Sequence, residues 1–281
     1  MRMLIEYAGQ IAYIDICIKR LLAFICIASE SACPYMRCRH TYRIIEGYRM
    51  IYDNLTIIIP TLNEEESIGT LISELKRRYG GVSIIVADDN STDSTRDIVL
   101  GMKRKYGGVT FLDRRKKRNH GLTASVVDAA LMAHTKYIVV MDGDLQHPPY
   151  MVKYLYNALR THDVAVGIRR KVKNWGAYRM LLSRGITVIT IFIFMLRRKS
   201  IVSDPMSGFF GVRAAIFKRV IRDNPDGFVP GGYKVLLDLL RMVGPGVSIA
   251  EIGYNTFHAR RYGRSKLRLH HMVDVLRSAL R

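Results

Sequence analysis

Cysteine is absent from most of this 281-residue chain. The four cysteines, Cys17, Cys26, Cys33 and Cys38, all lie within the first 52 residues. Their spacing with His40 does not match that of zinc sites, in which ligands come in closely spaced pairs. The rest of the chain therefore cannot form a disulfide, which is compatible with a reducing cytosol.

The sequence separations between the histidines do not match those of metal-binding sites either. We therefore expect no catalytic role for the histidines spread along the chain, which include His134, His147, His258, His270 and His271. Internal repeats and low-complexity tracts are also missing, which excludes solenoid and propeller architectures.

No apolar run is long and unbroken enough to cross a bilayer, which takes about 20 residues. The segment Ile186–Leu196 is apolar almost all round, but it is shorter than that and a basic tripeptide follows it at 197–199. It fits either an interfacial helix that lies on a membrane or an ordinary buried helix. The last stretch, His270–Arg281, is amphipathic and can lie on a membrane, on the body of the protein or on a partner.

Residues 1–52 form an extension whose status the sequence leaves open. The stretch Ile11–Ala28 is apolar, but Asp15 and two basic residues interrupt it, at roughly 3 kcal/mol each in a bilayer centre. It also lacks the order of a signal peptide, in which a basic region leads into an uninterrupted apolar core. The extension is either a helical anchor for a membrane or a partner, or a segment upstream of a real start near Met50.

Acidic residues are few relative to basic ones, 24 against 44, so the formal net charge is +20 at pH 7. The basic residues cluster at 114–118, 169–173, 197–199 and 260–268. Such clusters fit a nucleic-acid surface, an anionic lipid surface or the solvated surface of a heat-adapted protein. Since the chain has no helix-turn-helix, zinc-finger or aromatic RNA-binding motif, we do not expect a nucleic-acid partner.

The most informative stretch that is present covers residues 137–147. Its apolar part, Ile138–Val140, is typical of a parallel strand covered on both faces. Asp142, Asp144 and Gln146 follow at every second position, so on an extended chain their side chains point the same way. Such oxygen ligands suit Mg²⁺ or Mn²⁺. The stretch predicts a divalent-metal and diphosphate site, although Asp-Gly is also common in turns and aspartate in helix caps.

Two earlier strands run into polar residues in the same way. Leu55–Ile59 leads into Pro60, which we expect to end the strand. Ser83–Ala87 leads into Asp88 and Asp89. Because the carboxyl ends of parallel strands meet at one edge of a sheet, we expect all three polar loops to lie there.

Helical stretches separate these strands. We expect helices over 65–79, with Asn63 as a cap, over 94–105 and over 122–133. The alternation of strand and helix predicts an α/β fold with right-handed crossovers and a doubly wound, mostly parallel sheet.

Five motifs follow one another along roughly residues 55–267: Pro60-Thr-Leu-Asn-Glu64, Asp88-Asp-Asn-Ser91, Asp142-Gly-Asp-Leu-Gln146, Asp204-Pro-Met-Ser-Gly-Phe209 and Arg260-Arg-Tyr-Gly-Arg-Ser-Lys-Leu267. In this order they resemble the motif set of family 2 glycosyltransferases. Within that family the chain is most similar to dolichol-phosphate mannose synthases and related polyprenyl-phosphate sugar transferases. The resemblance implies a nucleotide-sugar transferase fold of the GT-A type.

The resemblance also implies roles for individual residues. The positions that hold the nucleoside are Pro60, Leu62, Glu64, Ala87 and Asp89. The positions on the metal and diphosphate are Asp142, Gly143, Asp144 and Gln146. Arg169 and Arg184 face phosphate or sugar. Arg260 and Lys266 match a mobile arm that closes over the donor diphosphate. We count Asp144, Arg169, Arg184, Arg260 and Lys266 as the catalytic set.

Two of these positions depart from the family pattern, and two acidic positions have competing interpretations. The family often has Tyr where this chain has Leu62, which puts a ring contact to the nucleotide in question. It often has Ala where this chain has Gly143, a change that leaves a backbone contact intact. Asp204 fits a second, acceptor-side carboxylate or a simple turn cap, and we favour the carboxylate. Because adjacent residues on an extended segment point apart, Asp89 rather than Asp88 should face the nucleoside.

The activity implied is inverting, metal-dependent transfer of a sugar to a polyprenyl (dolichyl) phosphate at a membrane surface. Mannose from GDP-mannose is the best match, but the residues do not separate it from UDP-glucose or a UDP-N-acetylhexosamine. The acceptor phosphate is already largely anionic at neutral pH, since its second pKa is about 6, so we expect direct attack and no covalent intermediate. A non-catalytic nucleotide-sugar-binding membrane protein is the rival, against which the intact motifs argue.

We expect the extension to be followed by one transferase domain over 53–281. Its nucleotide-binding core would cover 53–167, and 168–281 would supply acceptor-side helices, a strand or two near 247–257 and the basic arm. Some family members carry membrane spans after the arm, and no such run follows Lys266. Attachment to the cytoplasmic face of a membrane is therefore expected to be peripheral, through anionic lipid or a membrane-anchoring partner.

Overall fold

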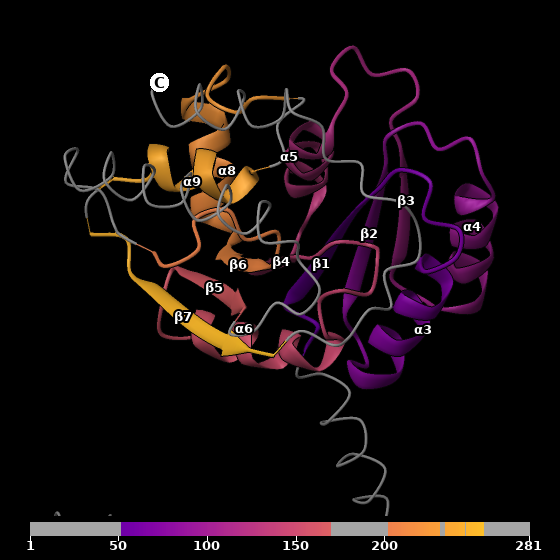
Figure 1. Ribbon diagram of the computed structural model, residues 1–281, viewed down its shortest axis with the longest axis horizontal. Coiled ribbons are helices and arrows are strands. Elements are labelled where there is room, and N and C mark those ends of the chain that lie inside the picture. The colour runs from indigo at the N-terminus through magenta and orange to yellow at the C-terminus, as the bar shows by residue number, and fades with distance from the viewer. Residues whose placement is uncertain (1–51, 170–201, 231–233, 245, 256–281) are drawn as a thin grey trace, which may run out of the picture. The chain divides into compact units, whose positions relative to one another are not determined.

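The structure, a computed structural model, describes residues 52–169, 202–230, 234–244 and 246–255. A seven-stranded sheet of order β3-β2-β1-β4-β6-β5-β7 forms its centre (Figure 1). The N-terminal extension up to residue 51, the apolar segment 186–196 and the basic arm lie outside the described residues. Among the helices that are described, none has the length and apolarity needed to cross a membrane.

The first half of the chain confirms the predicted alternation and the α/β fold class. Four strands pair in parallel: β1 (Leu55–Thr61), β2 (Ser83–Asp88), β3 (Val109–Asp113) and β4 (Tyr137–Val140). The helices between them are α3 (Ile68–Arg78), α4 (Thr95–Lys105) and α5 (Leu122–Met132). Every residue of β1 is buried, which explains why its sequence is a continuous apolar run.

The second half completes the same sheet. β6 (Phe210–Arg213) runs antiparallel between β4 and β5 (Val164–Arg169), and β7 (Ile249–Tyr254) pairs in parallel with β5. The strand expected near 247–257 is thus β7. The remaining helical elements are the 3₁₀ turn η2 (Pro149–Met151), α6 (Val152–Leu159), α8 (Ala214–Asp223) and α9 (Val235–Met242).

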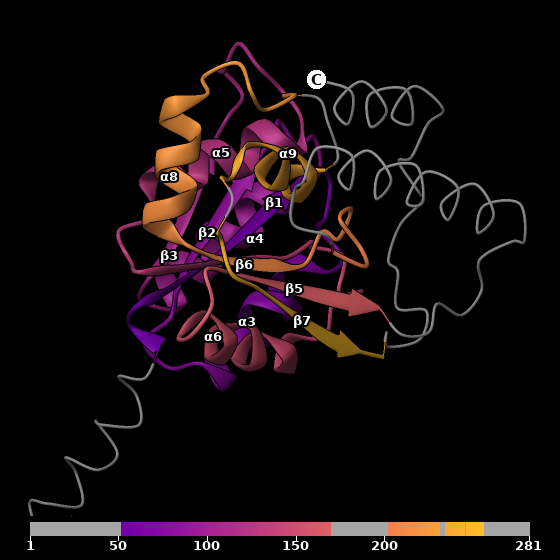
Figure 2. The ribbon, with the colours of Figure 1, turned by 90° about the vertical axis from the view of Figure 1, so that its left-hand side faces the viewer.

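Helices cover both faces of the sheet, as a doubly wound fold requires (Figure 2). Alternate side chains of each strand enter two separate cores, since successive residues of a strand point to opposite faces. Ile58 packs in the core beneath α5, α8 and α9, whereas Ile57 and Ile59 pack in the core beneath α3, α4 and α6.

Two local predictions are wrong. Pro60 does not end β1, which continues to Thr61. Ile58 faces β4, since its carbonyl accepts the Met141 amide, and Pro60 faces the same side two residues later. Because β4 has already ended there, at Val140, the missing N–H of Pro60 costs no sheet hydrogen bond.

Asn63 does not cap the following helix either. The helix begins at Ile68 rather than at 65, after a turn in which the Glu64 carbonyl accepts the amides of Ser67 and Ile68. Asn63 has a positive φ of 53°, a conformation that asparagine tolerates better than most residues. Its side-chain oxygen instead accepts the Thr92 amide at 2.8 Å, which ties the loop after β1 to the loop after β2.

Candidate active site

The loops that follow β1, β2 and β4 meet at one edge of the sheet, as predicted. Thr61, the last residue of β1, pairs with Asp88, and its carbonyl accepts the Asp89 amide at 2.9 Å. A Cβ added to Gly143 would lie 3.4 Å from Thr61 Cγ2 and 3.5 Å from Glu64 Cγ, so this glycine lies against the loop after β1. The edge therefore brings together the predicted residues Pro60, Leu62, Glu64, Ala87, Asp89, Asp142, Gly143, Asp144 and Gln146.

These residues differ in how their side chains can act. Pro60 and Ala87 are buried in the sheet, so they shape the edge rather than reach beyond it. Leu62 is 39% exposed and presents an aliphatic side chain. The carboxylate of Glu64 accepts the Ser67 hydroxyl at 3.3 Å, and its amide donates to Thr95 Oγ1 at 2.8 Å. Glu64 therefore also fixes the start of α3 against α4.

The Asp88 side chain forms hydrogen bonds that stabilise the loop after β2. It is 2% exposed. Its Oδ1 accepts the hydroxyls of Thr61 at 3.1 Å and Ser91 at 2.5 Å, and its Oδ2 accepts the Ser91 amide at 3.0 Å. These hydrogen bonds connect the ends of β1 and β2, so Asp88 has a structural role.

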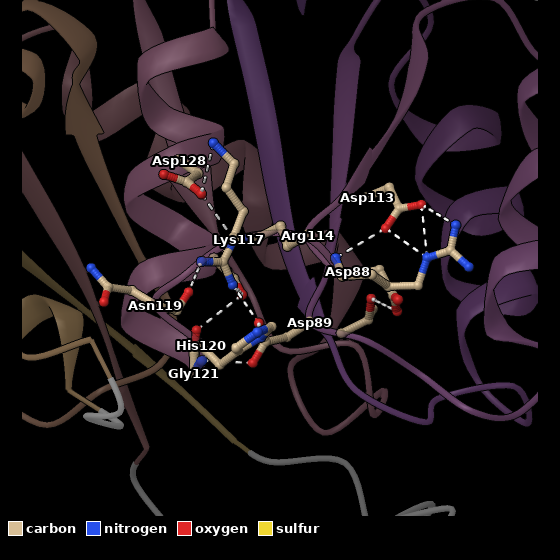
Figure 3. Close-up of polar contacts among 12 residues, drawn as sticks. Asp88, Asp89, Asp113, Arg114, Lys117, Asn119, His120, Gly121 and Asp128 are labelled. Carbon is tan, nitrogen blue, oxygen red and sulfur yellow. Dashed lines mark hydrogen bonds and ion pairs between the residues drawn. The ribbon is translucent and has the colours of Figure 1, made fainter.

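Asp89 points the other way, toward the segment after β3 (Figure 3). Its Oδ1 contacts His120 Nδ1 at 2.9 Å and Arg114 Nη1, and its Oδ2 accepts the Gly121 amide at 2.6 Å. A carboxylate offers about four acceptor positions. Three protein donors therefore leave Asp89 about one more hydrogen bond to accept.

The partner of Asp89, Arg114, is a residue whose role the sequence did not reveal. Its side chain is 1% exposed. It donates to Asp128 Oδ2 at 3.0 Å, to Ser125 Oγ at 2.9 Å and to the Asn119 carbonyl at 2.6 Å, in addition to Asp89 (Figure 3). Arg114 therefore fastens the basic segment 114–121 to α5 and to the edge of the sheet.

A signal for this role exists in the sequence. Arg114 directly follows Val109–Asp113, which forms β3, and a strand there places it at the same edge as Asp89. Taken only as part of the cluster 114–118, it looks like a surface residue. Its neighbours do fit that description: Arg115 is exposed and pairs with Asp113 at 2.7 Å, and Lys117 lies 3.8 Å from Asp128.

The predicted metal ligands follow the end of β4. Leu145 has a positive φ of 60°, and Asp144 Oδ1 accepts the Gln146 amide at 3.1 Å, so the loop turns sharply around Asp144. No three His, Cys, Asp or Glu side chains of the described ranges form a complete metal cage. Two carboxylates and one amide nevertheless fit Mg²⁺ or Mn²⁺, because such ions are often held by one or two carboxylates together with phosphate oxygens.

Asp142 is charged and firmly held. His147 Nε2 lies 3.0 Å from its Oδ2. Burial alone would raise the pKa of the Asp142 carboxyl, but its interactions with His147 lower that pKa. The charges of Arg169 and Lys234 act in the same direction, so the pKa ends below its ordinary value. The ionised form is the one that binds a cation.

Basic side chains and a second carboxylate from later in the chain interact electrostatically in this region. The pKa of Lys234 is lowered, chiefly by burial and then by the charge of Arg169, while the charges of Asp204 and Asp142 act in the opposite direction. Lys234 Nζ donates to the Met206 carbonyl at 2.8 Å. The buried Nε of Arg169 has no hydrogen-bond partner within the part of the chain that the structure describes.

Asp204 forms the turn cap considered for it, and its role as an acceptor-side carboxylate stays a prediction. Its Oδ1 accepts the Met206 amide at 3.2 Å, which is a turn-cap geometry. Its charge also acts on Lys234, so it lines the same cluster. The predicted residues Arg184, Arg260 and Lys266 lie outside the described residues, and their roles stay predictions.

Comparison with known proteins gives one matching family and several relatives. The family described as Glycosyl transferase family 2 matches residues 56–221. A dolichol-phosphate mannosyltransferase of Pyrococcus furiosus is 33% identical over 232 residues, which cover 81% of this chain and 63% of that protein. One from Saccharomyces cerevisiae is 34% identical over 161 residues, 54% of this chain and 57% of that protein. The chain therefore spans less than two thirds of the length of these relatives.

The same fold occurs in solved structures. Glucosyl-3-phosphoglycerate synthase from Mycobacterium tuberculosis, crystallised with phosphoglyceric acid, matches with a TM-score of 0.60 at 21% identity, covering 80% of this chain and 78% of that one. A second structure of that enzyme contains Mn²⁺, UDP and glucosyl-3-phosphoglycerate and matches with a TM-score of 0.59 over the same shares. These likenesses confirm the GT-A-type fold.

Proposed function

The chain belongs to glycosyl transferase family 2, and on that premise we propose that it transfers a sugar from a nucleoside diphosphate to a polyprenyl phosphate, dolichyl phosphate being the best match. One observation carries the proposal: Asp142 follows the end of β4 at the polar sheet edge, where His147 Nε2 lies 3.0 Å from its Oδ2, and the charges of Arg169 and Lys234 act on its carboxylate. Such a site can hold a metal-bound diphosphate on one side and an anionic acceptor on the other. The names of the matched relatives support dolichyl phosphate and mannose.

The donor side comprises the loops after β1, β2 and β4. The nucleoside would lie against Pro60, Leu62, Glu64, Ala87 and Asp89, where the remaining acceptor position of Asp89 is free to meet a base N–H or a ribose hydroxyl. The diphosphate would lie at Asp142, Gly143, Asp144 and Gln146. A divalent cation held there supplies electrostatic stabilisation of the leaving diphosphate. The Mn²⁺ and UDP in a solved structure of the same fold support this arrangement.

The acceptor side comprises Arg169, Asp204 and Lys234. Two basic side chains whose charges interact, one with a buried N–H that has no hydrogen-bond partner among the described residues, favour binding of a dianion such as a phosphate monoester. That phosphate needs no general base, because its second pKa is about 6 and its oxygen is already an anion at neutral pH. Arg169 and Lys234 would therefore orient the attacking oxygen opposite the leaving diphosphate, and in-line attack inverts the anomeric carbon.

Several parts of the proposal rest on the sequence resemblance alone. Arg184 would join Arg169 at phosphate or sugar, and Arg260 and Lys266 would close over the donor. The domain over 53–281 would act at the cytoplasmic face of a membrane, attached peripherally through anionic lipid or an anchoring partner. The net charge of +20 supports attraction to such a surface.

A transfer assay tests the function. The purified full chain is incubated with Mg²⁺ or Mn²⁺, a short polyprenyl phosphate and radiolabelled GDP-mannose, UDP-glucose or UDP-N-acetylglucosamine, and label is counted in the organic phase. We expect label chiefly from GDP-mannose and none with EDTA. The matched control is the corresponding polyprenol, which lacks the phosphate. Binding of a donor by calorimetry without transfer from any donor would instead indicate the non-catalytic nucleotide-sugar-binding protein.

Two glycines near the metal loop give a matched pair of substitutions. A Cβ at Gly208 would lie 2.8 Å from Asp142 Oδ2, so Gly208→Ala should displace this carboxylate. A Cβ at Gly143 meets its nearest neighbours at ordinary van der Waals distances, starting at 3.4 Å. We expect Gly208→Ala to reduce transfer by about tenfold or more, which corresponds to roughly 1.4 kcal/mol of barrier. Gly143→Ala should stay within about twofold, and equal rates for both variants would contradict this account.

A further inference from the structure

We infer that His147 is a positioning residue that holds the carboxylate of Asp142 in place for the metal ion, and that Tyr254 fixes the orientation and tautomer of the His147 ring. The inference rests on the proposed function, since it assigns the metal to Asp142. It gives a role to a histidine and to a strand β7 residue that the motif pattern leaves without one.

Both ring nitrogens of His147 are used. Nε2 lies 3.0 Å from Asp142 Oδ2, and Nδ1 lies 2.8 Å from the Tyr254 hydroxyl. Both the His147 and Tyr254 side chains are buried, at 2% and 3% exposure. These contacts connect residues 107 positions apart in the chain and link β7 to the metal loop.

The hydrogen-bond inventory requires a proton on Nε2 and, in a neutral ring, none on Nδ1. An ionised carboxylate can only accept, so Nε2 must donate to Asp142. In the neutral ring Nδ1 is then an acceptor, and the Tyr254 hydroxyl donates to it. Without this hydroxyl the ring is free to adopt the other tautomer, in which an unprotonated Nε2 would face the negative oxygen.

Packing holds the ring in this orientation. Phe209 stacks on His147 with ring centroids 5.0 Å apart and planes inclined by 21°. Phe209 in turn meets Tyr254 edge to face at 5.6 Å. A Cβ at Gly167 would come within 2.7 Å of the Phe209 ring and 3.1 Å of Tyr254, so only glycine lets these two rings approach the sheet this closely.

The result is a carboxylate held at one oxygen. Both oxygens of Asp142 lie near Gly208, but His147 binds only Oδ2, and no hydrogen bond within the described ranges reaches Oδ1. Oδ1 is therefore the oxygen presented to a cation. Hydrogen-bonding partners of metal ligands typically contribute 10- to 100-fold in metal affinity, because they fix the ligand in its binding geometry.

Four substitutions separate this role from simple packing. The side-chain amide nitrogen of glutamine lies as many bonds from Cα as Nε2, so His147→Gln can still donate to Asp142. The amide of asparagine is one bond shorter and corresponds to Nδ1, so His147→Asn cannot. His147→Phe keeps the stack on Phe209 but removes the donor. Tyr254→Phe keeps the ring packing and removes only the hydroxyl.

The test is Mn²⁺ binding by the full chain, alone and with GDP or UDP, measured as free Mn²⁺ by electron paramagnetic resonance. We expect His147→Phe and His147→Asn to weaken Mn²⁺ binding about 10- to 100-fold, His147→Gln to recover most of the loss, and Tyr254→Phe to lose a few-fold. Thermal melting in EDTA reports on the fold, and the Gln and Tyr254→Phe variants keep the test valid if His147→Phe does not fold.

The outcomes distinguish the inference from the proposed function. If the wild-type chain bound Mn²⁺ and all four variants bound it equally well, or if glutamine and asparagine failed alike, the positioning role would be wrong and the metal site would stand. If the wild-type chain bound no Mn²⁺ even with a nucleoside diphosphate, the proposed metal site would be wrong, and the role of His147 with it.

Discussion

Asp144→Ala is expected to reduce sugar transfer by at least about 10³-fold. A divalent ion contributes several kcal/mol of transition-state stabilisation, and each 1.4 kcal/mol corresponds to about a factor of ten in rate. In the proposed site Asp144 would supply a charged ligand, from a loop that follows the buried apolar strand β4. Its loss should therefore affect the reaction and leave the fold unchanged. Initial rates at saturating Mn²⁺ and donor measure the first effect, and thermal melting measures the second.

The matched control is Asp223→Ala, which removes an exposed carboxylate from the end of α8. It changes the net charge equally and should leave the rate unaltered. Undiminished transfer by the wild-type chain in EDTA would show that the reaction does not need a divalent ion. A parallel loss of melting temperature and activity in Asp144→Ala would show instead that Asp144 stabilises the loop.

Arg114→Met should have the largest effect on stability. The substitution leaves the Asp89 carboxylate, about 10% exposed, without its main counter-charge, and it also removes donors from Asp128, Ser125 and the Asn119 carbonyl. Breaking a buried ion pair by removing one partner typically costs about 3–5 kcal/mol. Urea unfolding should show this as a lower midpoint at unchanged slope.

The neighbouring residue provides the control. Arg115 pairs with Asp113 at the surface, so Arg115→Met should leave the urea midpoint nearly unchanged, because exposed pairs contribute little. The double variant Arg114→Met with Asp89→Asn should recover much of the lost stability, since it removes the uncompensated charge. Equal midpoints for the Arg114 and Arg115 single variants would refute the structural role of Arg114.

The fold was predictable from the sequence where a strand is buried on both faces, because such a strand has a continuous apolar sequence. β1, β2 and β4 are buried on both faces, and each run ends in polar residues at the edge of the sheet. β3 escaped prediction because four of its five residues are only partly buried or exposed, so its sequence, Val-Thr-Phe-Leu-Asp, lacks a continuous buried pattern. The antiparallel position of β6 between β4 and β5 depends on pairing with strands far away in the sequence. A local sequence pattern does not predict such pairing.

In the candidate site, too, local sequence predicts some features, and others depend on residues far apart in the chain. Local spacing was enough to separate the directions of Asp88 and Asp89. The extended geometry expected for Asp142, Asp144 and Gln146 is wrong, because β4 ends at Val140 and the chain turns at Leu145. Local spacing could not show that Arg114 is buried. A run of basic residues has the same sequence pattern whether it is exposed or paired with buried carboxylates. Local spacing could not show the role of His147 either, since its partner Tyr254 is 107 residues away.

The pairing of β6 with β4 limits how this site can change by evolution or engineering. Gly211 lies opposite Val139, and a Cβ there would come within 2.8 Å of Leu159 on α6. An insertion or deletion in the Asp204–Phe209 loop that shifted β6 by one position would bring Phe210 or Val212 to that spot and turn every β6 side chain to the opposite face. The number of residues in this loop is therefore constrained, as are their identities. New acceptor preferences should arise by exchange of side chains within this loop, and variants in which an altered loop length shifts β6 should fail to fold.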